Sequence, residues 1–220
     1  RGVNGAPRPP GPVATGLWLA IFGAVLLWSA IDPHDRATWW LEVLPALLAL
    51  VVIAFTRRRF PLTQLALWLI LAHAVVLMIG GHYTYARVPA FDWLRDALDL
   101  SRNHYDRVGH FFQGFVPAVV AREVLLRASP LGATAAGRRR WVPFLVVCFC
   151  LAVSAFYELL EWWVALLSET GAEAFLGTQG DVWDTQTDMF LCLVGAILAL
   201  LTLSRLHDAQ LGGPGAAPGP

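Results

Sequence analysis

The sequence contains no lysine and little charge of either sign. All 16 basic residues are arginine, 16 residues are acidic, and the formal net charge is zero. Charged residues make up 15% of the 220 residues, whereas about a quarter is usual in a soluble domain. Because a neutral chain lacks the positive field with which proteins hold nucleic acid, we expect no nucleic-acid partner.

Cysteine is scarce, and its positions exclude a disulfide framework or a cysteine metal site. The three cysteines, Cys148, Cys150 and Cys192, lie inside apolar stretches. Cys148 and Cys150 are two residues apart and therefore point to different faces of a helix. We interpret all three as small buried hydrophobic side chains.

Apolar residues are abundant instead, at 57% of the chain, and the mean hydropathy is +0.56. The charges fall in short stretches between long apolar runs, a pattern typical of a polytopic membrane protein. Lipid cannot satisfy backbone amides, so each run is predicted to be a helix. Six runs are long enough to cross the membrane: residues 16–32, 39–56, 62–81, 104–126, 141–166 and 184–205.

The sequence therefore predicts an all-α integral membrane protein with six transmembrane helices in one domain, residues 15–207. Residues 1–14 and 208–220 are rich in proline and glycine and are predicted to be flexible tails. Between the third and fourth runs, the segment FDWLRDALDL (91–100) mixes apolar and charged residues. It predicts a short interfacial helix between the third and fourth spans.

The arginines predict the orientation of the chain. Eleven of the 16 flank one set of span ends, including the run 57–59 and the run 138–140, and five flank the other set. Under the positive-inside rule the arginine-rich side is cytoplasmic. We therefore expect both termini in the cytoplasm and a location in the bacterial inner membrane.

Ionisable residues gather at the outer ends of the last three predicted spans. A charged group inside a membrane costs roughly 2.5–3.5 kcal/mol on insertion scales and usually faces the protein interior. Spacings of three or four residues place the members from each helix on one face. Three helices thus bring acids to one depth, with Glu42 as a looser candidate. The group comprises Asp106, Arg107 and His110, then Glu158 and Glu161, then Asp181, Asp184 and Asp188.

Two arrangements can hold so many carboxylates together. One is a divalent metal ion, and oxygen ligands with one imidazole suit Mg²⁺, Mn²⁺, Ca²⁺, Zn²⁺ or iron without selecting among them. The other is partial protonation of the acids. Under the metal hypothesis six residues bind the ion or act as acid and base: Asp106, His110, Glu158, Glu161, Asp184 and Asp188. The supporting residues are Arg107 and Asp181, with His82, Tyr83 and Tyr85 expected to cover the site.

Each acid also has a simpler interpretation. Asp181 and Asp184 suit helix caps in a solvated loop, where the glycines of GTQGD permit unusual backbone angles. Glu158 and Glu161 suit wetted residues at a helix end. Asp188 is the hardest to explain as solvated, because it lies a turn or more inside its span.

Four motifs carry a resemblance to a known family: HYTYARVP, DRVGHFFQGFVPA, YELLEWW and LGTQGDVWDTQTDM. They resemble the YjdF-type bacterial inner-membrane family, a domain of unknown function, over nearly the whole chain. The resemblance implies that the polar pattern is intact, and it implies no particular reaction. A looser likeness links the DRVGH opening and the spaced aspartates to VanZ-like membrane proteins, and no resistance role follows from it.

The leading hypothesis for function is a metal-dependent membrane enzyme acting on a lipid or lipid-linked envelope substrate. Its expected partners are membrane lipids and that substrate. A proton- or cation-coupled transporter or channel stays open, as does a structural membrane protein. A conduit needs polar residues through to the cytoplasmic side, and the inner halves of the last two spans, FLVVCFCLAV and LVGAILALLTL, offer almost none.

Overall fold

The computed structural model describes residues 10–167 and 178–212. These residues form helices, and no β-strand occurs among them. The elements in chain order are α1 (Pro12–Ala30), α2 (Arg36–Thr56), α3 (Gln64–Tyr83), α4 (Pro89–Ala97), α5 (Tyr105–Ala128), the 3₁₀ turn η1 (Pro130–Ala133), the π-helical turn η2 (Gly137–Trp141), α6 (Val142–Leu167) and α8 (Asp184–Gln210).

Five helical segments of the described chain are long and apolar enough to cross a membrane: α1, α2, α3, η2 continued by α6, and α8. They match five of the six predicted runs. The sixth run coincides with α5, which falls outside this group. Polar residues such as Gln113, Arg122 and Glu123 lower the hydropathy of α5. The sequence therefore located all six long helices, and five of them have the composition of a span.

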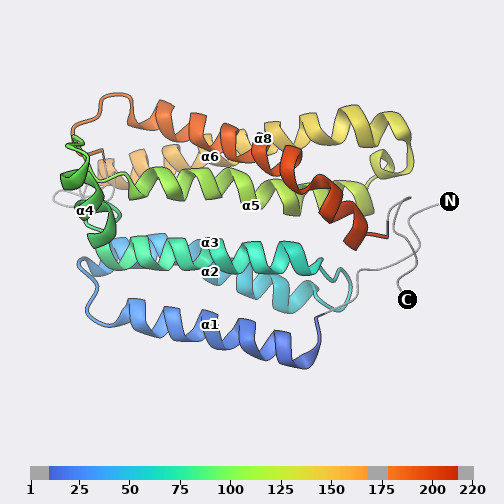
Figure 1. The fold of residues 1–220 in the computed structure, drawn as a ribbon, viewed down its shortest axis with the longest axis horizontal. Coiled ribbons are helices and arrows are strands. Elements are labelled where there is room, and N and C mark those ends of the chain that lie inside the picture. Colours follow the sequence, from blue (N-terminus) through green and yellow to red (C-terminus); the bar gives the residue numbers. More distant parts are fainter. Residues whose placement is uncertain (1–9, 168–177, 213–220) are drawn as a thin grey trace.

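The long helices lie side by side in two layers of three (Figure 1). One layer contains α1, α2 and α3, and the other contains α5, α6 and α8. The packing of α3 against α5 joins the layers, and α5 packs most extensively against α8. The short helix α4 covers one end of the bundle, here called the α4 end. The opposite end carries Arg57–Arg59 and Arg138–Arg140 and is called the arginine-rich end.

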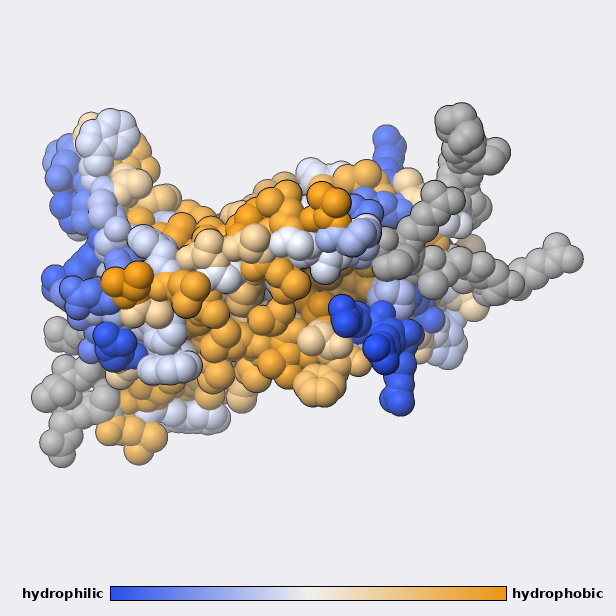
Figure 2. Space-filling model, turned by 90° about the horizontal axis from the view of Figure 1, so that it is seen from below, coloured by the Kyte–Doolittle hydropathy of each residue, from blue (hydrophilic) through white to orange (hydrophobic). Residues whose placement is uncertain are grey.

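The surface has the polarity expected of a membrane protein. Apolar residues cover the middle of the molecule, and hydrophilic residues lie at both of its ends (Figure 2). Large apolar side chains on the long helices are exposed, among them Leu48, Phe55 and Leu201. Exposing so much apolar surface to water would be unfavourable. An apolar belt between two polar ends therefore fits the hydrocarbon core of a membrane.

Small residues let α5 and α8 approach until their backbones touch. A Cβ atom on Gly114 would overlap the carbonyl oxygen of Cys192, and one on Gly195 would overlap that of Phe111. Close backbone approach through small residues is a common way to join membrane helices. Cys150 and Cys192 are buried at this seam as expected, but Cys148 is exposed. Its face of α6 turns away from the bundle.

A buried polar network joins the helices at the arginine-rich end. The fully buried Glu123 accepts hydrogen bonds from Thr63 Oγ1 at 2.7 Å, Arg127 Nη1 at 2.5 Å and His207 Nε2 at 3.1 Å. Arg122 Nη1 lies 3.2 Å from His207 Nδ1. Because arginine can only donate, Nδ1 accepts and Nε2 carries the proton. The network fixes the start of α3 against α5 and α8.

The tails begin closer to the chain ends than the sequence suggested. The first helix starts at Pro12, inside the predicted tail 1–14, and α8 continues to Gln210, past the predicted boundary at 208. Gln210 Oε1 accepts a hydrogen bond from Leu65 N at 2.9 Å, so α8 ends in contact with α3. Residues 1–9 and 213–220 of the predicted tails lie outside the described residues.

Candidate functional site

The structure brings together six ionisable side chains at the α4 end. Each of three helices contributes two of them, one turn apart: α5, α6 and α8. All are 9% exposed or less, although each can carry a charge. The six are Asp106 and His110, Glu158 and Glu161, and Asp184 and Asp188. We call this group the carboxylate cluster.

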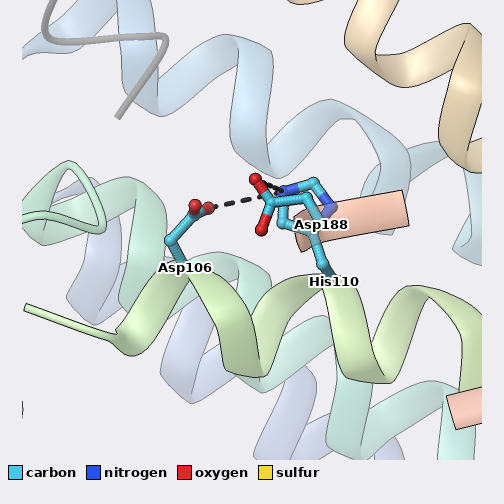
Figure 3. A group of neighbouring side chains, drawn as sticks. All are labelled: Asp106, His110 and Asp188. Carbon is cyan, nitrogen blue, oxygen red and sulfur yellow. Dashed lines mark ion pairs between the residues drawn. The ribbon is translucent and has the colours of Figure 1, made fainter. Parts of the chain in front are cut away.

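The ring of His110 faces two carboxylates, those of Asp106 and Asp188 (Figure 3). Its Nε2 atom is 3.5 Å from Asp106 Oδ1 and 3.8 Å from Asp188 Oδ2. One candidate ligand atom from each of these three residues lies within 4.8 Å of the others. Two acids from different helices therefore converge on one imidazole nitrogen.

Gln113 determines which ring nitrogen of His110 faces the acids. Gln113 Oε1 lies 3.2 Å from His110 Nδ1. An amide oxygen can only accept, so Nδ1 donates the proton of this bond. In a neutral ring, Nε2 then bears a lone pair that points toward Asp106 and Asp188. A positive species, either a proton or a metal ion, is needed to make this arrangement favourable.

Two carboxylate oxygens of the cluster have no hydrogen-bond partner among the described residues. They are Glu158 Oε1 and Asp188 Oδ1, and both atoms are buried. Glu158 Oε1 lies 3.8 Å from His110 Nδ1, beyond hydrogen-bonding distance. An unsatisfied buried polar group costs about 1–3 kcal/mol, and a charged one costs more. The described residues alone leave the cluster incompletely satisfied.

Arg102 is a member of the site that the sequence did not single out. It is 4% exposed, forms an ion pair with Asp184, and lies 3.5 Å from both Asp106 Oδ2 and Asp181 Oδ2. In the sequence it appears as an ordinary outer-loop arginine. It lies in the loop before α5, so no helical repeat in the sequence marked it.

Asp181 lies at the rim of the cluster. Its Oδ1 accepts a hydrogen bond from Trp183 N at 3.0 Å, and Arg107 Nη2 lies 3.1 Å from Oδ2. The Trp183 bond lowers the pKa of Asp181 below its usual value, and the charges of Arg102 and Arg107 lower it further. Asp181 thus lies in the turn before α8 and contacts Arg102 and Arg107, whereas Asp184 is buried against Arg102.

The turn that carries Asp181 is fastened to the start of α5. Gln179 Oε1 accepts from Asn103 N at 3.0 Å, and Gln179 Nε2 donates to Asn103 O at 2.9 Å. Gly180 has a φ of +85°, which side chains other than hydrogen disfavour. The turn chemistry expected of GTQGD therefore occurs at Gly180, while Gly177 lies outside the described residues.

A cavity of about 720 Å³ begins at the cluster and runs along α5 between the two layers. Its lining is polar at the α4 end, where six residues meet: Glu42, Tyr85, Asp106, His110, Tyr157 and Glu161. Its remaining lining is mostly apolar and reaches Leu62 and Leu125 near the arginine-rich end. Pro45 and Pro117 lie in its walls. A proline inside a helix removes one backbone hydrogen bond and disturbs the local turn.

The cavity lies between α2 and α6, which make few close contacts with each other. At the α4 end, a hydrogen bond of 3.1 Å from Tyr157 Oη to Glu42 Oε2 joins these two helices. Glu42, the looser candidate of the sequence, is 5% exposed and belongs to the polar end of the cavity. Tyr157 was missed, because a tyrosine among aromatic residues resembles an interfacial belt.

Of the three residues expected to cover the site, the structure places one beside it. The buried ring of Tyr85 lies between α3 and α5, against Gly80 and Gly109, and borders the cavity. His82 Nδ1 lies 3.1 Å from Ser29 O, and the rings of His82 and Tyr83 pack against Trp28 of α1. These two residues face α1 and lie outside the cavity lining.

Comparison with known proteins agrees with the resemblance that the motifs indicated. The chain is 50% identical to the inner membrane protein YjdF of Escherichia coli (strain K12) over 187 residues. The aligned region covers 85% of this chain and 87% of that protein. No solved structure matches the chain. A family model described as "Predicted membrane protein (DUF2238)" matches residues 14–209. The chain therefore belongs to this family of membrane proteins.

Proposed function

We propose that the chain is a multi-pass enzyme of the bacterial inner membrane that acts on a lipid or lipid-linked envelope substrate. In this proposal Asp106, His110 and Asp188 hold a divalent cation. One observation carries it: a buried cluster with unsatisfied carboxylate oxygens lies at the polar end of a long apolar cavity. The cluster suits chemistry on a polar headgroup, and the cavity suits an apolar tail.

The proposed placement uses all six long helices as spans. Five have the composition of spans, and α5 lies alongside them in the bundle (Figure 1). Its polar residues turn inward, as membrane helices require. The arginine-rich end is cytoplasmic, so both termini are cytoplasmic and the carboxylate cluster faces outward. Helix α4 then lies at the outer interface, and the printed name of the E. coli relative supports the inner membrane.

The spacing of the three ligand atoms supports the cation. Tetrahedral ligands at about 2.1 Å from a metal ion are separated by about 3.4 Å. The observed separations of 3.5 and 3.8 Å around His110 Nε2 are close to that value. The Gln113 contact matches the usual pattern in which a ligating histidine donates its other N–H to a fixed acceptor. Nitrogen and oxygen ligands suit several divalent metals.

The other cluster residues have roles that follow from their positions. A bound divalent cation lowers the pKa of a coordinated water and so supplies a nucleophile near neutral pH. Glu158 lies next to His110, and Glu161 borders the cavity, so these two can accept or return a proton. Arg102 holds Asp184 and extends to Asp106, and thereby fixes the position of one ligand.

The cavity supports a substrate with a long apolar tail. Its lining runs along α5 from Asp106 to Leu125, which at 1.5 Å per residue is about 28 Å. This length is close to the thickness of the hydrocarbon core, about 30 Å. Since α2 and α6 make few close contacts with each other, a lipid can enter sideways from the bilayer. The tail then fills the cavity while the headgroup reaches the carboxylate cluster.

The transport alternative needs a polar path to the arginine-rich end. Beyond Gln113 the cavity is lined along α5 by Val116, Pro117, Val120 and Val124, which offer no side chain that an ion could use. Glu123, the acid at this level of α5, is absent from the lining and accepts hydrogen bonds from Thr63 and Arg127. A pocket that is polar at one end only favours an enzyme over a conduit.

A lipid-conversion assay tests this proposal. The purified protein is incubated with a bacterial envelope lipid extract and each candidate cation, and products are followed by mass spectrometry. We expect Asp188→Asn to abolish conversion together with metal binding. Ala49→Trp, which fills the cavity wall, is expected to abolish conversion and leave metal binding intact.

Asp99→Asn is the matched control, because Asp99 is an exposed acid at the same end of the molecule. It removes the same charge and is expected to retain full conversion. The proposal is wrong if the wild type converts no lipid with any cation. It is also wrong if Asp188→Asn converts lipid as fast as the wild type.

A further inference from the structure

A second groove lies at the arginine-rich end, far along the bundle from the carboxylate cluster. It has a volume of about 350 Å³ and lies where α1 begins, α2 ends and α3 begins. Its floor is apolar and includes Ala14, Trp18, Ala54 and Leu67. The indole of Trp18 donates to Leu67 O at 2.8 Å, which fixes this ring in the floor. The groove is therefore a formed apolar slot at the end opposite the carboxylate cluster, and it shares Ile53 and Leu62 with the wall of the larger cavity.

Positive charge is concentrated at the mouth of this groove. Arg57 and Arg58 line it, both are exposed, and neither forms an ion pair with any described residue. Among the residues that the structure describes, no acid lines the groove. Elsewhere at this end, Arg122 and Arg127 are neutralised by Asp208 and Glu123. The groove thus combines an apolar floor with two uncompensated cations.

Two more side chains can donate hydrogen bonds at the groove. Gln64 is exposed, and Trp68 is 37% exposed, and both line the groove where α3 begins. Indole and amide groups commonly contact lipid headgroups at the membrane boundary. A ligand that matches the site carries negative charge and hydrogen-bond acceptors at one end and a hydrocarbon chain at the other.

We propose that this groove binds one anionic phospholipid. The phosphate pairs with Arg57 and Arg58, and one acyl chain lies against Trp18 and Ala54. Juxtamembrane arginines attract anionic lipids, with an effect of about fivefold in affinity for each residue. A zwitterionic lipid lacks the net charge that would complement the two arginines. This inference does not depend on the proposed function.

Native mass spectrometry of the full-length protein with added palmitoyl-oleoyl phosphatidylglycerol or phosphatidylcholine tests the site. We expect the wild type to prefer phosphatidylglycerol. The double variant R57Q/R58Q is expected to lose roughly 25-fold in affinity for it. Ala54→Trp, which fills the slot without changing charge, is expected to reduce binding as well.

The double variant R139Q/R140Q is the matched control. Both residues are exposed at the same end, form no ion pair with any described residue, and lie outside the groove. It is expected to bind phosphatidylglycerol like the wild type. An equal loss in this control, full binding by Ala54→Trp, or no preference between the two lipids would each overturn the proposal.

Discussion

His110 is held in one orientation by a neighbour on its own helix. Gln113 accepts the Nδ1 proton, so Nε2 faces Asp106 and Asp188, which come from two different helices. A glutamine three residues after the histidine thus sets the chemistry that the ring presents to the acids. This residue acts as a positioning residue, because it does not itself reach the space between the carboxylates.

We predict that Gln113→Leu weakens divalent-cation binding by about 10- to 100-fold, the usual effect of removing such a partner. The ring loses its acceptor and no longer favours one tautomer. Isothermal titration with Mn²⁺ or Zn²⁺ measures the change. Gln113→Glu keeps an acceptor oxygen and is expected to restore most of the affinity. Equal affinities in wild type and Gln113→Leu would contradict this role.

Asp35 caps α2 outside the membrane-spanning segments, and its Oδ1 accepts from Thr38 N at 2.7 Å. This bond is the main cause of a lowered pKa. Because the folded pKa lies below the unfolded value of about 3.9, the ionised cap stabilises the protein above about pH 4. That stabilisation is lost as the pH falls through the folded pKa.

We therefore predict that Asp35→Ala lowers the unfolding free energy by about 1 kcal/mol at pH 7. The difference from the wild type should shrink toward zero as the pH falls below the folded pKa of Asp35. Unfolding in detergent, followed by circular dichroism from pH 2.5 to 7, measures it. Asp35→Ser retains a cap that does not titrate, and its stability should lack this part of the pH dependence.

The sequence identified the six residues of the carboxylate cluster from helical spacing and predicted depth. It did not identify Arg102, and it gave Glu42 only a minor place. The cluster was predictable because each of the three helices carries two ionisable residues at a spacing that places them on one face. Arg102 lies in a loop and Glu42 is alone on α2, so neither shows a repeat that marks its face. Their places depend on packing between segments far apart in the sequence.

At the scale of elements, the seam between α5 and α8 positions the site. Gly114 and Gly195 let the two backbones touch, one turn or more beyond His110 and Asp188. The two helices can bring their acids together only if this contact is close. The sequence shows both glycines, but it does not show which helix each of them packs against.

We predict that Gly114→Ala lowers the unfolding free energy by about 1–3 kcal/mol, because its Cβ overlaps the Cys192 backbone and the helices must separate. Metal affinity should fall with it. The control is Gly23→Ala on α1, where a Cβ atom meets nothing within 4 Å. That change should be neutral or stabilise by roughly 0.5–1 kcal/mol. Similar melting temperatures for the two variants would contradict close packing at the seam.

The helix boundaries show what apolar patterning resolves and what it does not. It located all six long helices but started α1 four residues late and ended α8 five residues early. At the C-terminal end, Gln210 and His207 are polar residues that tertiary contacts hold in the helix. The apolar pattern of the sequence does not reveal these contacts with Leu65 and Glu123, so it predicted an earlier end for α8.

At the scale of the whole molecule, polarity divides the protein into an apolar band and two charged ends (Figure 2). The ends differ, because most arginines lie at one and most acids at the other. This asymmetry underlies the proposed orientation. It also separates the carboxylate cluster at the α4 end from the groove at the arginine-rich end.

We predict that single cysteines at positions 96 and 139, in a background without Cys148, Cys150 and Cys192, label from opposite sides of intact inner membranes. A membrane-impermeant maleimide should reach position 96 from the periplasm and position 139 only after the cells are opened. The two positions lie in α4 and η2, at opposite ends of the bundle. Labelling of both from outside would contradict the six-span placement.

The cation content of the purified protein tests the central proposal most directly. After chelation, reloading and desalting, the divalent metal per chain is measured by mass spectrometry in wild type, Asp188→Asn and Asp99→Asn. We predict about one ion per chain in the wild type and Asp99→Asn, and almost none in Asp188→Asn. A wild-type protein that retains no metal, or an Asp188→Asn variant that retains as much as the wild type, would contradict the proposed site.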